Sequence, residues 1–166
     1  MTRRTKRYWL VKSEPHVFSF DDLLAAKGQK TPWDGVRNYQ ARNLMRDEMK
    51  PGDGVLYYHS NADPVGVVGV AEVVSEPYPD ALQFDPKSKY FDEKATLENP
   101  RWILVDIGAV RPLERIVTLA ELKAEPALES MEVVRKGSRL SVQPVAAPEW
   151  KKVLSMARKA AAENPR

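Results

Sequence analysis

The chain has 166 residues, of which 43% are hydrophobic and 30% charged, and this composition is typical of a globular protein with a single domain. It contains no cysteine, which excludes disulfides, thiolate metal sites and cysteine nucleophiles and is consistent with a reducing compartment. The formal net charge is +3, but Arg3, Arg4, Lys6 and Arg7 supply four of the positive charges, so the rest of the chain carries a net charge of −1.

The N-terminal residues predict neither a signal peptide nor a membrane anchor. Only four apolar residues, 8–11, follow the basic start, and no apolar run approaches the roughly 20 residues that cross a bilayer. We therefore expect a cytoplasmic protein with no membrane partner. Residues 1–7 are expected to form a flexible basic arm, which either aids solubility or neutralises phosphates.

Two short helices are predicted to follow a first strand at 8–11. Ser19 is a favourable N-cap for the first helix, and Gly28 ends it. The second helix covers 38–49, where apolar residues recur at helical spacing, and Asn38 is placed to cap it.

The remaining strands are expected at 54–60, 65–74, 101–110 and 138–145. The segment 65–74 is apolar on both faces, as is typical of a central strand or a barrel wall, and Gly66 and Gly69 indicate bends or a close approach of backbones.

Three further segments complete the expected secondary structure. Thr118 and Glu121 have capping-box spacing, so a helix is expected to begin there, and 126–137 is expected to be helical as well. Pro148 opens a final helix with an apolar face. The long segment 75–100 has no clear period, but its aromatic residues favour an ordered, packed loop.

These elements predict the α+β class rather than a doubly wound sheet. About five strands with short helices between them favour a small mixed or antiparallel β-barrel flanked by helices. We expect a single domain over 8–157, followed by a C-terminal tail at 158–166.

The sequence offers little for catalysis. His16 and His59 are the only histidines, and two distant histidines without a cysteine argue against a transition-metal site. His59 and Ser60 are neighbours on a predicted strand, so their side chains point to opposite faces and cannot form a nucleophile–base pair. No Walker-A or GxGxxG motif is present. We therefore expect no enzyme activity, no metal and no cofactor.

Polar and aromatic residues gather in three stretches, "WLVKSEP" (9–15), "WDGVRNYQARN" (33–43) and "SRLSVQPV" (138–145). Indole and phenol rings stack on nucleobases, and amides offer the donors and acceptors that read a base edge. Each residue also has a plainer interpretation: Trp33 as core, Asn38 as a helix cap, Arg42 as part of a solvated helix face and His59 as an ordinary strand residue.

Several motifs in order resemble the EVE domain family, the family of the thymocyte nuclear protein in the PUA-like superfamily. They are "YWLVKSEP", "WDGVRNYQARN", "MKPGDGVLYYHSN", "GVVGVAEVVSEPYPD", "QFDPKSKYFD", "PRWILVDI" and "GSRLSVQPV", although "DALQ" (80–83) is less typical. The resemblance implies a PUA-like barrel that takes a modified nucleobase into a pocket without catalysis. It implies a pocket lined by Lys12, Ser13, Glu14, Trp33, Val36, Arg37, Asn38, Tyr39, Gln40, Asn43, His59, Ser60, Arg139, Ser141 and Gln143.

The leading hypothesis is therefore a monomeric reader of a modified base, with modified cytosine in DNA as the candidate, which flips the base and stacks it on Trp33 or Tyr39. The candidates for phosphate contacts are Arg3, Arg4, Lys6, Arg7, Arg42, Lys87 and Lys89. Three alternatives remain open: an RNA-binding module for a modified or unpaired nucleotide, a nucleotide-modifying enzyme and a protein-interaction module.

Overall fold

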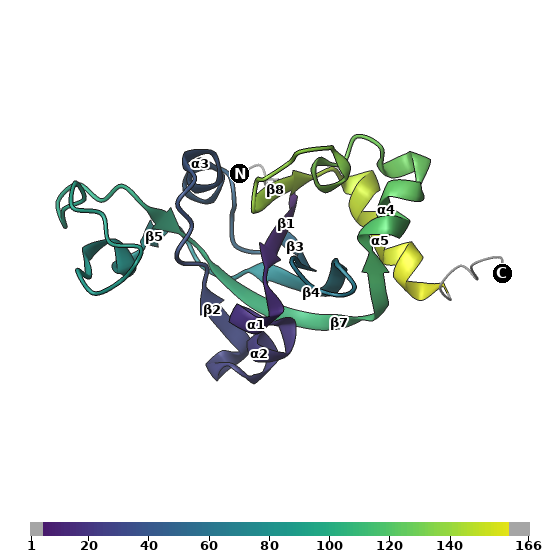
Figure 1. The fold of residues 1–166 in the computed structure, drawn as a ribbon, viewed down its shortest axis with the longest axis horizontal. Helices are drawn as coiled ribbons and strands as arrows, with labels where there is room; N and C mark the ends of the chain where they lie inside the picture. Colours follow the sequence, from purple (N-terminus) through teal and green to yellow (C-terminus); the bar gives the residue numbers. More distant parts are fainter. Residues whose placement is uncertain (1–4, 160–166) are drawn as a thin grey trace.

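In a computed structural model of the protein, which describes residues 5–159, a curled six-stranded sheet has helices on both faces (Figure 1). The strands lie in the order β2-β7-β4-β3-β1-β8. Their bounds are β1 Tyr8–Ser13, β2 Lys30–Pro32, β3 Gly54–His59, β4 Gly66–Val73, β7 Asp106–Thr118 and β8 Val142–Val145. A second sheet pairs β5 (Tyr78–Pro79) with β6 (Ile103–Leu104).

The sheet is mixed because β1 runs parallel to β3, whereas every other pair in it is antiparallel. It curls into a half-barrel, with β2 and β8 at its edges. This architecture confirms the predicted α+β class and the small PUA-like β-structure. The short edge strand β2 was not expected from the sequence.

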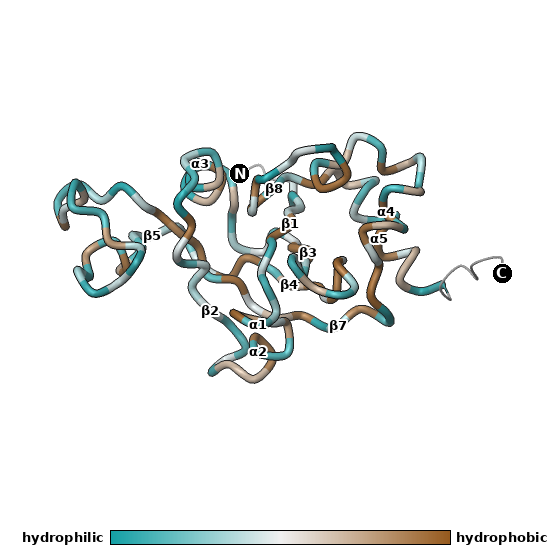
Figure 2. Tube along the Cα trace, viewed as in Figure 1, coloured by the Kyte–Doolittle hydropathy of each residue, from teal (hydrophilic) through white to brown (hydrophobic). Residues whose placement is uncertain are grey.

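Each central strand buries both of its faces. Along β3, Val55 and Tyr57 face one hydrophobic cluster, while Leu56 and Tyr58 face another. Successive side chains of a strand point to opposite faces, so a strand between two cores must be apolar throughout. Figure 2 shows this as hydrophobic colour along the strands, and the predicted central position of β4 is confirmed.

The glycines of β4 allow close packing, as the sequence predicts. A Cβ on Gly66 would lie 2.3 Å from the Val117 carbonyl oxygen, and one on Gly69 would lie 2.5 Å from the Phe20 ring. Neither position has room for a side chain.

Residues 5–159 form five α-helices, of which three begin at the side-chain caps predicted from the sequence, whereas the short helix Pro15–Phe18 was not expected. Their bounds are α1 Pro15–Phe18, α2 Phe20–Ala25, α3 Tyr39–Asp47, α4 Leu119–Ala124 and α5 Ala147–Arg158. Ser19 and Asp22 form a capping box on α2, and Thr118 and Glu121 form another on α4. The Asn38 side chain accepts a hydrogen bond from the Ala41 N–H at 2.9 Å and so caps α3.

The prediction of one strand at 101–110 is wrong. Leu104 pairs with Tyr78 in the small sheet, whereas Asp106 pairs with Pro32 in the large one, so the chain changes partners at Val105. From there β7 continues to Thr118, well beyond the predicted end.

The predicted helix at 126–137 is also wrong, because only two 3-10 turns form there, at Pro126–Leu128 and Glu132–Val134. Leu128, Met131 and Val133 are all buried. Their spacing of three and then two residues does not fit one face of an α-helix, and the backbone at Met131 is extended.

The strand predicted at 138–145 is shorter, since β8 begins at Val142. Gln143, one of the pocket candidates, is buried in this strand.

Residues 75–100 form a lobe at the opposite end of the molecule from α4 and α5, and hydrophilic residues predominate in it (Figures 1 and 2). The expected order is present: the buried Gln83 amide donates to the carbonyl oxygens of Asp80 and Trp102 and accepts from the N–H groups of Arg101 and Trp102. The packing inferred from aromatic residues is incomplete, since Tyr78 and Phe91 are exposed.

Two features are absent from residues 5–159. No helix there is long and apolar enough to cross a membrane, and no group of three or more His, Asp or Glu side chains could hold a metal ion. The predicted arm and tail lie largely outside the described residues, as do Arg3 and Arg4, and the domain bounds stay a prediction.

Candidate functional site

A cavity of about 440 Å³ opens where the end of β1 meets the segment between β2 and α3. Its volume is within the roughly 300–1,000 Å³ that ligand pockets occupy. Its walls mix aromatic, aliphatic, hydroxyl and charged groups. They are formed by Lys12, Ser13, Val17, Phe18, Thr31, Trp33, Asp34, Gly35, Val36, Arg37, Tyr90 and Ser141.

The wall formed by β1 and α1 is fixed by two hydroxyl groups. The Ser13 Oγ and the Tyr57 hydroxyl both donate to the Phe18 carbonyl oxygen, at 2.6 and 2.8 Å. Burial raises the pKa of Tyr57 to about 12, so the phenol keeps its proton and remains a donor at neutral pH. Phe18 is thereby held at the cavity wall.

Trp33 belongs to both the core and the cavity. Only 9% of the residue is exposed, and its ring packs edge-on against Tyr57 with centroids 5.5 Å apart. The Trp33 N–H donates to the Val105 carbonyl oxygen at 3.0 Å, which fastens the segment to the sheet. The core interpretation of Trp33 and the pocket interpretation are therefore compatible.

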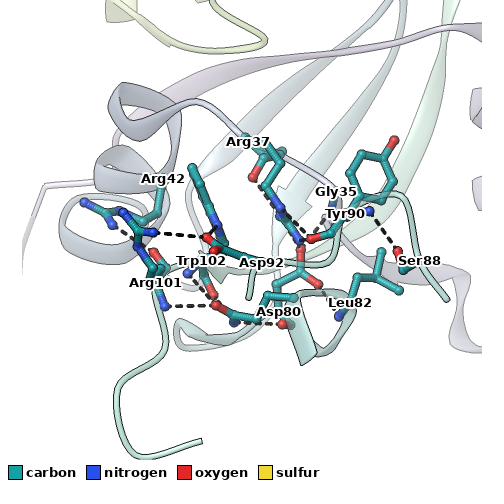
Figure 3. A network of polar contacts seen from close by, with 12 residues as sticks. Gly35, Arg37, Arg42, Asp80, Leu82, Ser88, Tyr90, Asp92, Arg101 and Trp102 are labelled. Atoms are coloured by element: carbon teal, nitrogen blue, oxygen red, sulfur yellow. Dashed lines mark hydrogen bonds and ion pairs between the residues drawn. The ribbon is translucent and has the colours of Figure 1, made fainter. Parts of the chain in front are cut away.

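Arg37 joins this segment to the lobe (Figure 3). Its Nε and Nη2 donate to the Tyr90 carbonyl oxygen at 3.1 and 2.8 Å, and its Nη1 donates to Asp80 Oδ2 at 3.0 Å. Asp80 Oδ2 also accepts from the Gly35 N–H at 2.9 Å. With a further bond from Nη1 to the Val36 carbonyl oxygen, four of the five guanidinium N–H groups that an arginine offers are in use.

Asp34 occupies the rim of the cavity. Partial desolvation raises its pKa, the Asp80 carboxylate raises it further, and the Arg37 guanidinium opposes both effects. Because Asp80 receives the Arg37 Nη1 donor, the Asp34 carboxyl keeps its capacity to accept a hydrogen bond from a ligand.

The structure brings together six of the fifteen pocket candidates: Lys12, Ser13, Trp33, Val36, Arg37 and Ser141. The other nine, which do not line this cavity, are Glu14, Asn38, Tyr39, Gln40, Asn43, His59, Ser60, Arg139 and Gln143. Their roles in binding stay predictions.

Several of these nine have structural partners. Tyr39 stacks on Trp102 with centroids 4.7 Å apart. Glu14 accepts from Asn61 at 3.1 Å, and the Gln143 Nε2 donates to the Leu140 carbonyl oxygen at 2.7 Å.

His59 acts as a hydrogen-bond acceptor beside the cavity. Its Nε2 accepts from the Phe20 N–H, at the first turn of α2, at 3.1 Å. Burial lowers the pKa of His59, while Asp21 and Asp22 oppose that shift, and the neutral ring is the form that can accept this bond.

The phosphate candidates are spread over three regions. Lys87 and Lys89 are exposed on the lobe, and Arg7 pairs with Glu48 at 3.0 Å. Lys6 is exposed near Tyr8. The Arg42 guanidinium donates to Asn43 and to the Arg101 carbonyl oxygen, so much of its donor capacity is used within the protein.

Six lining residues were not among the candidates: Val17, Phe18, Thr31, Asp34, Gly35 and Tyr90. Asp34 and Gly35 lie inside the quoted stretch at 33–43, and Tyr90 lies inside "QFDPKSKYFD", so these motifs contained the signal. No pattern in the sequence singles out Val17, Phe18 or Thr31.

Comparisons with known proteins agree with this architecture. Thymocyte nuclear protein 1 of Homo sapiens is 41% identical over 169 residues, covering 92% of this chain and 74% of that protein. The Gallus gallus protein of the same name is 40% identical, covering 90% of this chain and 68% of its own length.

Solved structures have the same fold. The human THYN1 protein in complex with DNA containing 5-methylcytosine superposes with a TM-score of 0.87 at 40% identity, covering 93% of this chain and 99% of that one. A Leishmania major protein gives a TM-score of 0.85 at 50% identity, covering 92% and 95% of the two chains. The family model described as the EVE domain matches residues 7–156, and the chain is therefore a member of the EVE domain family.

Proposed function

We propose that this protein binds DNA and reads a modified cytosine, which leaves the base stack and enters the cavity beside Trp33. The observation that carries the proposal is the cavity itself, in which an indole wall and a carboxylate at the rim lie together. The human relative solved in complex with DNA containing 5-methylcytosine supports the choice of ligand.

Stacking in the cavity offsets the cost of flipping. Extruding a base costs a few kcal/mol, and stacking on an aromatic side chain is worth about 1–3 kcal/mol per base. Trp33 and Phe18 supply aromatic walls, and both are held by hydrogen bonds or packing before any ligand arrives. The wall therefore loses little conformational entropy on binding.

Asp34 is suited to reading the cytosine edge. Cytosine presents an amino donor at N4 where thymine presents a carbonyl acceptor, and a carboxylate accepts only from the donor. A thymine at this position would bring two acceptors together. Asp34 thereby selects cytosine, while the apolar side chains of Val17 and Val36 offer a place for a methyl group.

The preference for a methylated base is modest. One methyl group in an apolar niche is worth about 1–3 kcal/mol, which corresponds to about 10–200-fold in affinity. The wall of the cavity favours binding over catalysis, because the Ser13 hydroxyl donates to a main-chain carbonyl and no histidine of residues 5–159 lines the cavity to activate Ser141 or Thr31.

The test is a titration of three duplexes that differ at one position: cytosine, 5-methylcytosine or thymine opposite guanine. We expect the wild-type protein to bind the 5-methylcytosine duplex tightest. Trp33→Ala should weaken binding to the methylated duplex most, and Asp34→Asn should reduce the preference for cytosine over thymine by about 10-fold or more.

A matched control is Trp150→Ala, which removes an indole that packs on Tyr8 away from the cavity. An RNA of the same sequence competes in the same assay. Equal binding of all three duplexes by the wild type, or preference for the RNA, would contradict the proposal.

A further inference from the structure

A second cavity, of about 560 Å³, lies beside the first and has a different character. Four cationic side chains line it, those of Lys12, Lys123, Arg135 and Lys136, around apolar residues that include Tyr58 and Val133. We call this cavity the basic groove. Its charge is notable because the chain beyond its first seven residues has a net charge of −1.

Lys12 connects the basic groove to the cavity beside Trp33, because it lines both. Its Nζ lies 5.8 Å from the centroid of the Tyr58 ring, which belongs to the hydrophobic cluster on the opposite face of the sheet from Trp33. Successive strand residues are about 3.3 Å apart and face opposite sides, so Lys12 and Ser13 direct adjacent side chains toward the two cavities. The two cavities therefore meet at the end of β1.

Glu132 does not line the basic groove, but it contacts two residues that do, Arg135 and Ser138. It pairs with Arg135 at 3.3 Å and accepts from the Ser138 Oγ at 2.9 Å. Burial lowers the pKa of Lys12, and the Glu132 charge opposes that shift. Within residues 5–159, Lys123 and Lys136 form no ion pair, so the groove keeps an excess of positive charge.

We propose that the basic groove binds the phosphates of the DNA strand adjacent to the nucleotide whose base enters the cavity beside Trp33. This rests on the proposed function, because the strand must reach the groove from that cavity. A flipped base would leave its own phosphates at the mouth of the cavity. The basic groove begins there at Lys12, and within residues 5–159 its Lys123 and Lys136 form no ion pair. Phosphate contacts of this kind fix position and add affinity without reading sequence.

The test compares Arg135→Gln/Lys136→Gln with a charge-matched control, Arg158→Gln/Lys159→Gln, at the end of α5. Affinity for the 5-methylcytosine duplex is measured at several salt concentrations. Each phosphate contact contributes about −0.9 to the slope of log K against log salt. The groove variant should bind more weakly and show a slope shallower by about 1–2, while its preference for methylated over unmethylated cytosine stays that of the wild type.

The outcomes separate the groove from the base cavity. An unchanged slope in the groove variant, or an equal change in the control, overturns the groove proposal even when the wild type prefers methylated DNA. A wild type that binds DNA without that preference, but with the expected slope change, supports the groove and contradicts the base-reading function. A wild type that does not bind DNA overturns both. Circular dichroism spectra establish that each variant folds.

Discussion

Gly35 allows the cavity wall and the lobe to meet. Its φ is +78°, in the left-handed region that disfavours residues with a Cβ. A Cβ at this position would also lie 2.9 Å from the Tyr90 ring, which lines the cavity. Thus the backbone conformation and the close approach both require glycine here.

Gly35→Ala should lower the free energy of unfolding by more than the ~1–2 kcal/mol that a left-handed Cβ costs, because the Tyr90 ring must also move. Gly52→Ala is the control, since Gly52 has a φ of +93° with nothing within 4 Å of the added Cβ. Urea denaturation of both variants measures the difference. Equal losses of stability would show that the contact with Tyr90 is unimportant.

His59 makes stability depend on pH. Its folded-state pKa is lower than the roughly 6.5 of an unperturbed histidine, so the unfolded chain takes up the proton first as pH falls. The stability contributed by the neutral ring is therefore complete above about pH 6.5 and is lost as pH falls through the lowered pKa.

His59→Gln should flatten the dependence of the urea midpoint on pH below about pH 6.5, since glutamine accepts from the Phe20 N–H at any pH. His16→Gln serves as the control, because His16 is exposed on α1. If both variants keep the wild-type dependence, another group is responsible for it.

Among the elements, the helices were the most predictable because side chains fix their starts locally. Ser19, Asn38 and Thr118 could be recognised as caps from a few neighbouring residues. The structure of segment 126–137 could not be recognised locally. Burial of Leu128, Met131 and Val133, in the hydrophobic cluster that also contains Leu56 and Tyr58, overrides its helical composition. The ends of the strands could not be predicted for a similar reason, because the exchange of partners at Val105 depends on β2 and β5.

Part of the site was predictable because several of its residues are neighbours in the sequence. Trp33, Val36 and Arg37 lie in one conspicuous stretch, and they do line the cavity. Phe18 reaches it only because the Ser13 and Tyr57 hydroxyls hold its carbonyl group, which is a tertiary contact that no local pattern reveals.

Substitutions of Asn38 distinguish two roles of its side chain, capping α3 and reading a base through its amide. Asn38→Ala should cost about 0.5–2 kcal/mol of stability, while Asn38→Asp should keep the cap and the wild-type stability. Because Asn38 does not line the cavity, we expect Asn38→Asp to retain the affinity for 5-methylcytosine DNA. A stable Asn38→Asp protein with lost affinity would assign the amide to the ligand instead.

At the scale of the molecule, the lobe at 75–100 is joined to the body through Asp80 and Arg37 (Figure 3). Only 3% of the Asp80 side chain is exposed, and its partner Arg37 is 20% exposed, so this pair is shielded from solvent. It places Tyr90 at the cavity and connects two regions far apart in the sequence.

Asp80→Asn should lower the free energy of unfolding by about 1.5–3 kcal/mol, because it removes a charged acceptor from a buried network. Asp85→Asn, on the exposed side of the same lobe, should change it by less than about 0.5 kcal/mol. Urea denaturation compares the two, and limited proteolysis should cut the lobe faster in Asp80→Asn alone. Equal effects of the two substitutions would contradict the anchoring role of Asp80.

The central claim is that a modified cytosine leaves the helix and occupies the cavity beside Trp33. A 2-aminopurine placed next to a 5-methylcytosine in a duplex reports this directly, because its fluorescence rises when the neighbouring base unstacks. We predict a saturable rise with the wild-type protein and a much smaller rise with Trp33→Ala at concentrations where both bind DNA. Saturated binding by the wild type with no change in 2-aminopurine fluorescence would contradict the account.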